Sequence, residues 1–249
     1  MRNASMCSIY KTIAYNPQAL KIYMELKRRS AKDNFWSFCL YYDPMFFCRR
    51  MFLRQIAEAF MRVYESYSSG VIYRLAVSMP PRAGKSYISS LFIAWMLGKH
   101  PEESVMRNCC SSQLYNKLSY DTRMILRSAK FQSVFNGIVL RNDKQNLAGW
   151  SLDSARQVSY FGAGVGGTVI GFGASMLAMT DDLYKSLEDA LSDNNNEKVW
   201  SWKQGTHDSR IEGSCCMIDI GTRWSSSDVL GRLEEAGKYN EIIRIAALD

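Results

Sequence analysis

The chain has 249 residues and a mass of 28.4 kDa, with 47% hydrophobic and 22% charged residues, so it can bury a sizeable core without disulfides or a structural metal. This composition excludes collagen-like, low-complexity and largely disordered chains. Two histidines are too few for a multi-histidine metal cage, and the seven cysteines contain no C-x-x-C spacing, which argues against a zinc knuckle or a disulfide framework. We expect a folded protein of a reducing compartment with no membrane partner, because the longest apolar run, residues 88–97, is too short to span a bilayer.

The positive charge is concentrated at the amino-terminal end. The net charge is +7; residues 1–62 hold eleven Lys or Arg against four Asp or Glu, whereas the rest of the chain holds twenty of each. Two basic clusters, at residues 27–32 and 49–54, flank the aromatic stretch 35–47. Basic residues interleaved with rings can follow a nucleic-acid backbone, but a helical layer with buried rings and a solvated charged face is the commoner arrangement.

The pattern of the chain predicts two parts. Residues 17–66 are rich in helix formers, with breaks at Asn16-Pro17 and Asp43-Pro44, and predict an N-terminal helical subdomain over residues 1–66. From residue 67 to 249, short apolar runs alternate with helix-like stretches, which predicts an α/β fold with a mainly parallel sheet flanked by helices. The expected strands are 71–79, 104–110, 175–180, 214–220 and 241–248, and the expected helices are 87–97, 113–128 and 228–236.

Two segments interrupt this alternation. Residues 134–174 predict a β-hairpin or a loop excursion, and Ser192–Glu197, with the sequence SDNNNE, resembles an exposed linker. Residues 162–167 match the dinucleotide fingerprint G-x-G-x-x-G, but that motif must open a helix, and the residues after it favour a loop and a strand. We therefore interpret this match as a flexible glycine-rich hairpin.

The strongest chemical signal is MPPRAGKS at residues 79–86, between an expected strand and an expected helix. Backbone N–H groups of a phosphate-binding loop converge on phosphate oxygens, its lysine reaches the β- and γ-phosphates, and its hydroxyl ligates magnesium. Gly84, Lys85 and Ser86 match this Walker A pattern, whereas Met79 stands where the pattern has its first glycine. A chance turn is the alternative, but the strand before and the helix after are the context that the motif requires.

A pair of carboxylates follows the strand expected at residues 175–180. A P-loop enzyme that hydrolyses a nucleotide needs one carboxylate near magnesium and usually a second that orients the attacking water. Asp181 is the candidate magnesium residue of a Walker B motif, and Asp182 is the candidate catalytic base, shorter than the glutamate common there. The alternative is that the pair caps a helix.

Taken in this order, these segments resemble the ATPase domain of the large terminase subunit, the DNA-packaging motor of tailed bacteriophages and related viruses. The resemblance covers about residues 50–249. Residues 79–86 look like the family's arginine-containing P-loop, residues 180–192 like its Asp-Asp segment, and residues 209–235 like the segment that contains Thr-Arg-Trp. Leu183 stands where the family commonly has a proline.

This resemblance implies an ASCE-type P-loop NTPase fold, with ATP as the nucleotide and Mg²⁺ as the metal. It assigns phosphate and magnesium contacts to Lys85 and Ser86, a phosphate contact to Arg82, and to Thr222 the coupling of hydrolysis to movement. The nucleotide-binding residues it implies are Pro81, Arg82, Ala83, Gly84, Lys85, Ser86 and Tyr87.

Two further assignments are less direct. Several terminases carry an arginine that reaches into the neighbouring subunit's active site, but the corresponding position here is Phe172. If an arginine acts between subunits, Arg210 is the first candidate and Arg156 the second, and a salt bridge is an equal interpretation for either. Gln55 matches the glutamine that reads adenine in many such motors, with a surface position as the alternative.

The function expected from the sequence is that of an ATP-hydrolysing motor domain that drives double-stranded DNA into a procapsid. The resemblance implies double-stranded DNA, a portal protein, a small terminase subunit and sibling subunits in a homo-oligomeric ring as partners, in the host cytoplasm. Two alternatives are a helicase-type P-loop DNA translocase and a nucleotide-binding scaffold with little turnover, which the short Asp182 side chain keeps open.

Overall fold

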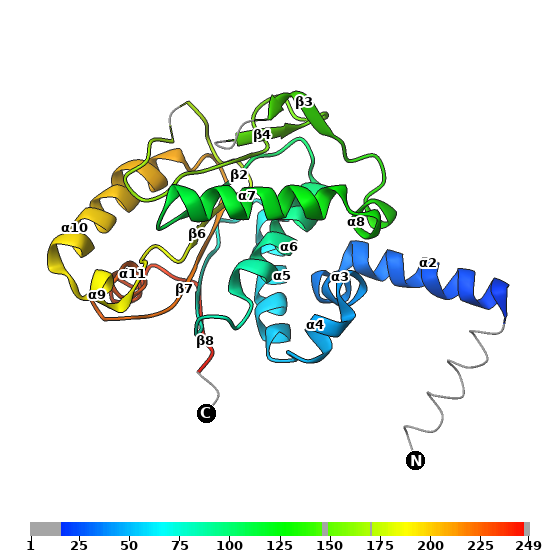
Figure 1. Ribbon diagram of the computed structural model, residues 1–249, viewed down its shortest axis with the longest axis horizontal. Helices are drawn as coiled ribbons and strands as arrows, with labels where there is room; N and C mark the ends of the chain where they lie inside the picture. Colours follow the sequence, from blue (N-terminus) through cyan, green and yellow to red (C-terminus); the bar gives the residue numbers. More distant parts are fainter. Residues whose placement is uncertain (1–15, 146–148, 170, 247–249) are drawn as a thin grey trace, which may run out of the picture.

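The computed structural model describes residues 16–145, 149–169 and 171–246, and within them eight strands form one sheet in the order β3-β4-β5-β2-β6-β7-β1-β8 (Figure 1). The pairs β5-β2, β2-β6, β6-β7, β7-β1 and β1-β8 are parallel, whereas β3-β4 and β4-β5 pair antiparallel. Their bounds are β1 Arg74–Ser78, β2 Val105–Cys109, β3 Leu140–Gln145, β4 Gly149–Leu152, β5 Tyr160–Phe161, β6 Leu177–Asp181, β7 Cys216–Gly221 and β8 Glu241–Arg244.

Helices flank the sheet on both sides, with α5 and α6 on one side and α10 and α11 on the other (Figure 1). The bounds are α2 Pro17–Asp33, α3 Phe35–Tyr42, α4 Pro44–Cys48, α5 Leu53–Ser68, α6 Lys85–Lys99, α7 Ser112–Arg127, α8 Ala129–Val134, α9 Leu187–Leu191, α10 Asp193–Trp202, η1 Lys203–His207, η2 Asp208–Arg210 and α11 Val229–Glu235. The expected α/β fold with a mainly parallel sheet flanked by helices is therefore confirmed.

Side chains of the central strands alternate between the two faces. Leu177 and Met179 of β6 belong to the large core beneath α5, α6 and α7, whereas Ala178, between them, belongs to a second cluster on the opposite face. This period of two is the property of a strand that is covered on both sides. A third cluster, which includes Val199 and Leu233, joins α10 to α11.

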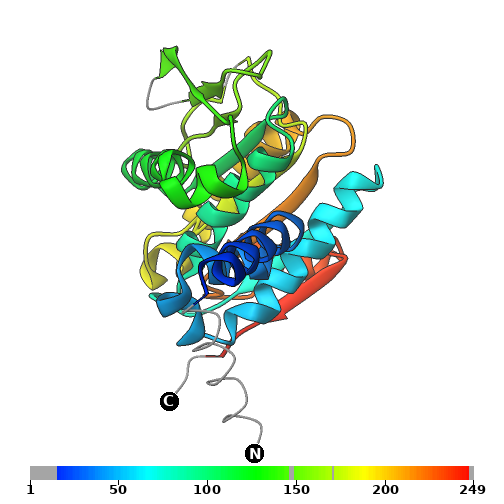
Figure 2. The ribbon, with the colours of Figure 1, turned by 90° about the vertical axis from the view of Figure 1, so that its right-hand side faces the viewer.

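The N-terminal helices share one hydrophobic cluster with the sheet and α6. The rings of Phe35 and Phe92 lie edge to face with centroids 5.0 Å apart, and the indole nitrogen of Trp95 donates to the carbonyl of Ala31 at 2.9 Å. Figure 2 shows α2 and α5 lying along the same side of the molecule. Phe35, Trp36, Phe38 and Phe47 of the aromatic stretch 35–47 are buried in the core. This agrees with the interpretation of the stretch as a helical layer with buried rings. The boundary at residues 66 and 67 stays a prediction and lies within α5.

Proline and capping residues set the N-terminal helix starts. Pro17 and Pro44 each stand in a first helical turn, a position that suits proline because it has no N–H to leave unpaired there. Asn16 and Asp43 accept hydrogen bonds from other backbone N–H groups of those turns. Both expected breaks are confirmed. A third break occurs at Asn34, whose side chain accepts from the Ser37 N–H at 2.9 Å.

Two expectations between the core strands need correction. Residues 192–197 are no linker, because Ser192 caps α10 and Asn196 is buried within it. The glycine-rich segment after β5 is no hairpin either: β5 and β6 both pair in parallel with β2 and lie on opposite sides of it, so the segment crosses over β2. A Cβ on Gly162 would lie 1.8 Å from the carbonyl oxygen of Arg107, and that close approach requires glycine. No helix follows the glycines in the described residues up to β6, which removes the dinucleotide interpretation.

Of the helices that the structure describes, none combines the length and the apolar character needed to cross a membrane.

Candidate functional site

The loop of residues 79–84 joins the carboxyl end of β1 to the start of α6. Gly84, the residue before the helix, has φ +104°, and a Cβ there would meet the Phe46 ring at 3.0 Å, so this position needs glycine. Arg82 is exposed and also has a positive φ, +62°. Met79 is buried in the core, and its N–H donates to the Gly221 carbonyl at 3.1 Å. The methionine therefore continues the strand pairing at the position where the general motif has a glycine.

Lys85 connects three strand ends. Its ammonium donates to the Met79 carbonyl at 3.2 Å and to the Thr222 hydroxyl at 2.7 Å, and it lies 3.2 Å from Asp182 Oδ1. The side chain is only 5% exposed. Met79, Asp182 and Thr222 follow β1, β6 and β7 directly, so parallel pairing brings their loops to one edge of the sheet.

Ser86 and Asp181 form a second contact between α6 and β6. The Ser86 hydroxyl donates to Asp181 Oδ1 at 3.3 Å, and Asp181 is fully buried. One hydroxyl and one carboxylate oxygen side by side suit Mg²⁺, which prefers oxygen ligands and takes most of its shell from water and substrate phosphates. No group of three or more His, Cys, Asp or Glu that could hold a metal ion occurs in the described ranges.

Asp182 is held in an uncommon backbone conformation. Its φ is +49°, its N–H donates to the Ile220 carbonyl at 3.0 Å, and its Oδ1 accepts from the Thr222 N–H at 3.0 Å. Burial, followed by the charge of Asp181, raises the pKa of the Asp182 carboxyl, and Lys85 opposes that shift. The fixed carboxylate faces Lys85.

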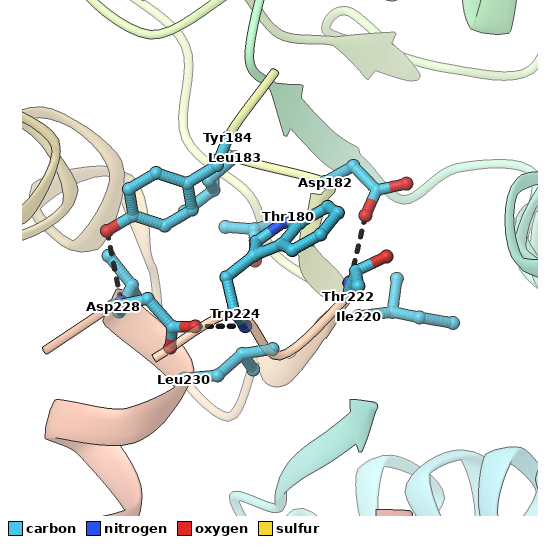
Figure 3. Close-up of a pocket in the computed structure, with 11 residues that line it drawn as sticks. Thr180, Asp182, Leu183, Tyr184, Ile220, Thr222, Trp224, Asp228 and Leu230 are labelled. Atoms are coloured by element: carbon cyan, nitrogen blue, oxygen red, sulfur yellow. Dashed lines mark hydrogen bonds between the residues drawn. The ribbon is translucent and has the colours of Figure 1, made fainter. Parts of the chain in front are cut away.

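The loop after β7 anchors Thr222 to α11 (Figure 3). The Asp228 carboxylate accepts from the N–H groups of Trp224 and Ser225 at 2.8 and 3.1 Å, and the Tyr184 hydroxyl accepts from the Val229 N–H at 3.1 Å. Tyr184, Trp224, Asp228 and Val229 line a pocket of 20 Å³ next to Asp182. The loops after β6 and β7 are thus bonded to each other and to the start of α11.

A larger cavity lies directly over the loop of residues 79–84. It has a volume of 310 Å³ and is lined by Pro81, Arg82, Asp182, Phe46 and the residues from Gly84 to Tyr87. A neighbouring cavity of 580 Å³, lined by residues of α6 and α7, shares Ser86 and Tyr87 with it. The Tyr87 hydroxyl donates to Asp43 at 3.2 Å, which links α6 to the start of α4.

Three residues singled out from the sequence lie elsewhere. Gln55 is exposed on α5 and does not line the cavity over the loop of residues 79–84. Arg210 ends η2, where the neighbouring Ile211 bridges Ala174, and Arg156 is exposed in the turn before β5. Both arginines therefore lie at the amino-terminal edge of the parallel strands. A six-residue strand such as β7 separates the two edges by about 20 Å, so neither arginine reaches Asp182 of its own chain.

Arg107 belongs to the site although sequence reasoning missed it. It stands in the middle of β2 with no exposed surface, forms an ion pair with Asp181 and donates to the Ser90 hydroxyl at 2.8 Å. Burial is the largest influence and lowers the pKa of Arg107, but the charges and hydrogen bonds of Asp181 and Tyr160 together outweigh it, so the pKa is raised. The available signal was an arginine inside a buried strand, since such a charge needs a partner.

A buried polar cluster lies on the opposite face of the same strands. Thr180 donates to Asp219 at 2.7 Å, and Lys203, fully buried, lies 3.5 Å from that carboxylate. The Asn108 amide contacts His207 Nδ1 at 2.7 Å while its oxygen accepts from the Ala163 N–H, so the amide nitrogen donates to a neutral imidazole. Burial, Lys203 and Arg74 lower the pKa of His207 well below its ordinary value.

The neutral His207 predicts a loss of stability in mild acid. Because its folded-state pKa is depressed, the unfolded chain takes up this proton first, so the loss starts near pH 6.5 and grows by up to about 1.4 kcal/mol per pH unit. Urea unfolding at pH 7.5 and 5.5 measures it. His207→Gln, which cannot titrate, should lose less stability over that interval than the wild type, and equal losses in the two proteins would contradict the assignment.

No family model matches the sequence, and the search of curated proteins returned no match.

Proposed function

We propose that this chain is a P-loop ATPase, the motor domain of a viral DNA-packaging terminase that drives double-stranded DNA into a procapsid. The observation that carries the ATPase part is the position of Lys85. Its ammonium contacts the loops after β1, β6 and β7, at Met79, Asp182 and Thr222 respectively, and each of these residues belongs to one of the three motifs found in the sequence. An ammonium held at that junction matches the requirement of phosphoryl transfer, which depends on positioned charge rather than on covalent chemistry by the protein.

The strand order supports the ASCE-type class. In that class an additional strand separates the strand of the P-loop from the strand of the acidic motif, and here β7 lies between β1 and β6. Asp182 after β6 and Thr222 after β7 then contact Lys85 from adjacent strand ends, and Asp181 at the end of β6 lies beside Ser86. In this proposal, Thr222, which follows the middle strand β7, senses the terminal phosphate.

The residues of the site divide the work. ATP phosphates would occupy the 310 Å³ cavity, where Lys85 and Arg82 supply positive charge. Ser86 and Asp181 would hold magnesium, which when bound neutralises charge that develops on the phosphates. Asp182 orients the attacking water and takes up its proton, and burial favours this role because a raised pKa makes a carboxylate a better base.

Thr222 provides a physical link to movement. Its hydroxyl accepts from Lys85, while its N–H donates to Asp182. Phosphate oxygens are stronger partners for an ammonium than a hydroxyl is, so nucleotide binding would release the Thr222 hydroxyl. The loop of Thr222 is bonded to α11 through Asp228, which gives this local change a route to the rest of the protein.

The step from ATPase to packaging motor rests on the resemblance of the three motifs in their order. It brings with it double-stranded DNA, a portal, a small terminase subunit and sibling subunits in a ring as proposed partners in the host cytoplasm. Arg210 and Arg156 lie at the edge of the sheet opposite to Lys85. Neither arginine can therefore contact a nucleotide bound to its own subunit, and a catalytic role for either requires the nucleotide of a neighbouring subunit.

The test is ATP turnover by the purified chain over a range of protein concentrations, with and without Mg²⁺ and duplex DNA. We expect turnover that requires Mg²⁺, increases with duplex DNA and rises per subunit with protein concentration, since a second subunit's arginine can add orders of magnitude in rate. Nucleotide binding without turnover in every condition would favour the scaffold instead. Separation of the DNA strands would favour a helicase-type translocase.

A further inference from the structure

Arg107 is the most deeply buried cation next to the candidate nucleotide site. Its guanidinium reaches three groups at once: it pairs with Asp181 Oδ2, donates to the Ser90 hydroxyl at 2.8 Å and donates to the Ser86 carbonyl at 3.1 Å. Asp181 and Arg107 each have no exposed side-chain surface. Arg107 belongs to β2, the neighbour of β6, and it therefore ties the first turn of α6 to the end of β6.

This arrangement fixes both oxygens of Asp181. Oδ2 is taken by Arg107, and Oδ1 accepts from the Ser86 hydroxyl at 3.3 Å. A carboxylate with one oxygen held by a planar guanidinium cannot rotate without breaking that bond. The oxygen left beside Ser86 is the one that the proposed function assigns to magnesium.

The charges at the site are balanced in pairs. Lys85 lies 3.2 Å from Asp182, and Arg107 pairs with Asp181. The two adjacent carboxylates would otherwise form a doubly negative site in a buried setting, which attracts a divalent cation strongly. With both carboxylates compensated, that attraction is largely cancelled until phosphates bring further negative charge.

We propose that Arg107 is a positioning residue of the magnesium part of the site, one that keeps Asp181 oriented toward Ser86 and restricts divalent cations to binding together with nucleotide phosphates. This inference rests on the proposed function, because it assumes that the cavity over the P-loop takes a nucleotide. It deepens that function by adding an order of binding, in which the divalent cation binds only when nucleotide phosphates are present.

The first test measures Mn²⁺ binding to the nucleotide-free protein by electron paramagnetic resonance. Mn²⁺ accepts the same oxygen ligands as Mg²⁺. Arg107→Gln uncovers the negative charge of Asp181, so we expect Mn²⁺ affinity to increase at least about tenfold over wild type, and the double variant Arg107→Gln with Asp181→Asn to lose that gain. Arg74→Gln is the matched control: Arg74 is a half-buried strand arginine that pairs with Asp208 at 3.7 Å, away from the P-loop, and its removal should leave Mn²⁺ binding unchanged. Equal Mn²⁺ affinity of folded Arg107→Gln and wild type would overturn the proposal.

The second test uses Arg107→Lys, which keeps the buried charge and so preserves the fold should Arg107→Gln not fold. A lysine cannot bond Asp181, Ser86 and Ser90 together, so orientation is lost while charge remains. We expect the ratio of ATP affinities with and without Mg²⁺ to fall about 10- to 100-fold, and ATP affinity in EDTA to stay at the wild-type value. An unchanged ratio overturns the positioning role. If the wild type binds no ATP in either condition, the proposed nucleotide function fails, and the Mn²⁺ comparison still decides whether Arg107 masks the carboxylates.

Discussion

Lys85→Ala is expected to reduce ATP turnover by about 10²–10³-fold, because it removes the preorganised donor that meets charge developing on the phosphates. The same substitution removes the ammonium that contacts Asp182 Oδ1 and the Thr222 hydroxyl. Nucleotide binding should weaken as well, since the ammonium serves the ground state and the transition state alike. Steady-state turnover together with fluorescent-nucleotide binding measures both effects.

Lys99→Ala is the matched control for that variant. Lys99 ends the same helix, and its ammonium lies 3.8 Å from Asp33, far from the P-loop. Its loss should leave turnover near the wild-type value. Wild-type turnover by a folded Lys85→Ala protein would show that the phosphate site lies elsewhere.

Asp182→Asn is expected to lower turnover by about 10²–10⁴-fold while nucleotide affinity changes little, because an amide cannot take a proton from water whereas a carboxylate base can. The asparagine oxygen can still accept from the Thr222 N–H and from Lys85, the bonds that Asp182 Oδ1 accepts now, and asparagine tolerates a positive φ. Binding and single-turnover hydrolysis of Mg²⁺-ATP separate the two quantities.

Asp181→Asn provides the contrast for Asp182→Asn. Asp181 bonds Ser86 rather than Thr222, so its amide variant should need a higher Mg²⁺ concentration for half-maximal turnover, a shift that Asp182→Asn lacks. Asp153→Asn, in an exposed turn after β4, is the control for the loss of one carboxylate. Identical Mg²⁺ titrations of the two site variants would contradict the division of roles.

Sequence patterns predicted the alternation of strands and helices because apolar periodicity and proline positions are local properties. They placed β1, β2, β6 and β7 to within a few residues. They failed at residues 192–197, whose polar composition suggested a linker, because a capping serine and the burial of Asn196 decide that helix. They also could not give the strand order, which depends on pairing between segments far apart in the chain.

For the site, motif spacing selected Lys85, Ser86, Asp181 and Asp182, and the family resemblance added Thr222. The structure brings these residues together at one edge of the sheet. Spacing could not select Arg107, because its partners Ser90 and Asp181 are 17 and 74 residues away and only the fold makes them neighbours. Gln55 illustrates the reverse case. It matches a motif position, yet its helix directs it to solvent.

The positive φ of Asp182 has a consequence for the choice of acid at this position. Aspartate and asparagine enter the left-handed region more readily than other residues that have a side chain, so a chain that turns this way at the end of β6 favours the shorter acid over glutamate. The turn is itself fixed, since the Asp182 N–H bonds Ile220 and its carbonyl accepts from Cys110. The short side chain at position 182 and the left-handed backbone there therefore depend on each other. A glutamate at this position would require a different path of the chain between β6 and Leu183.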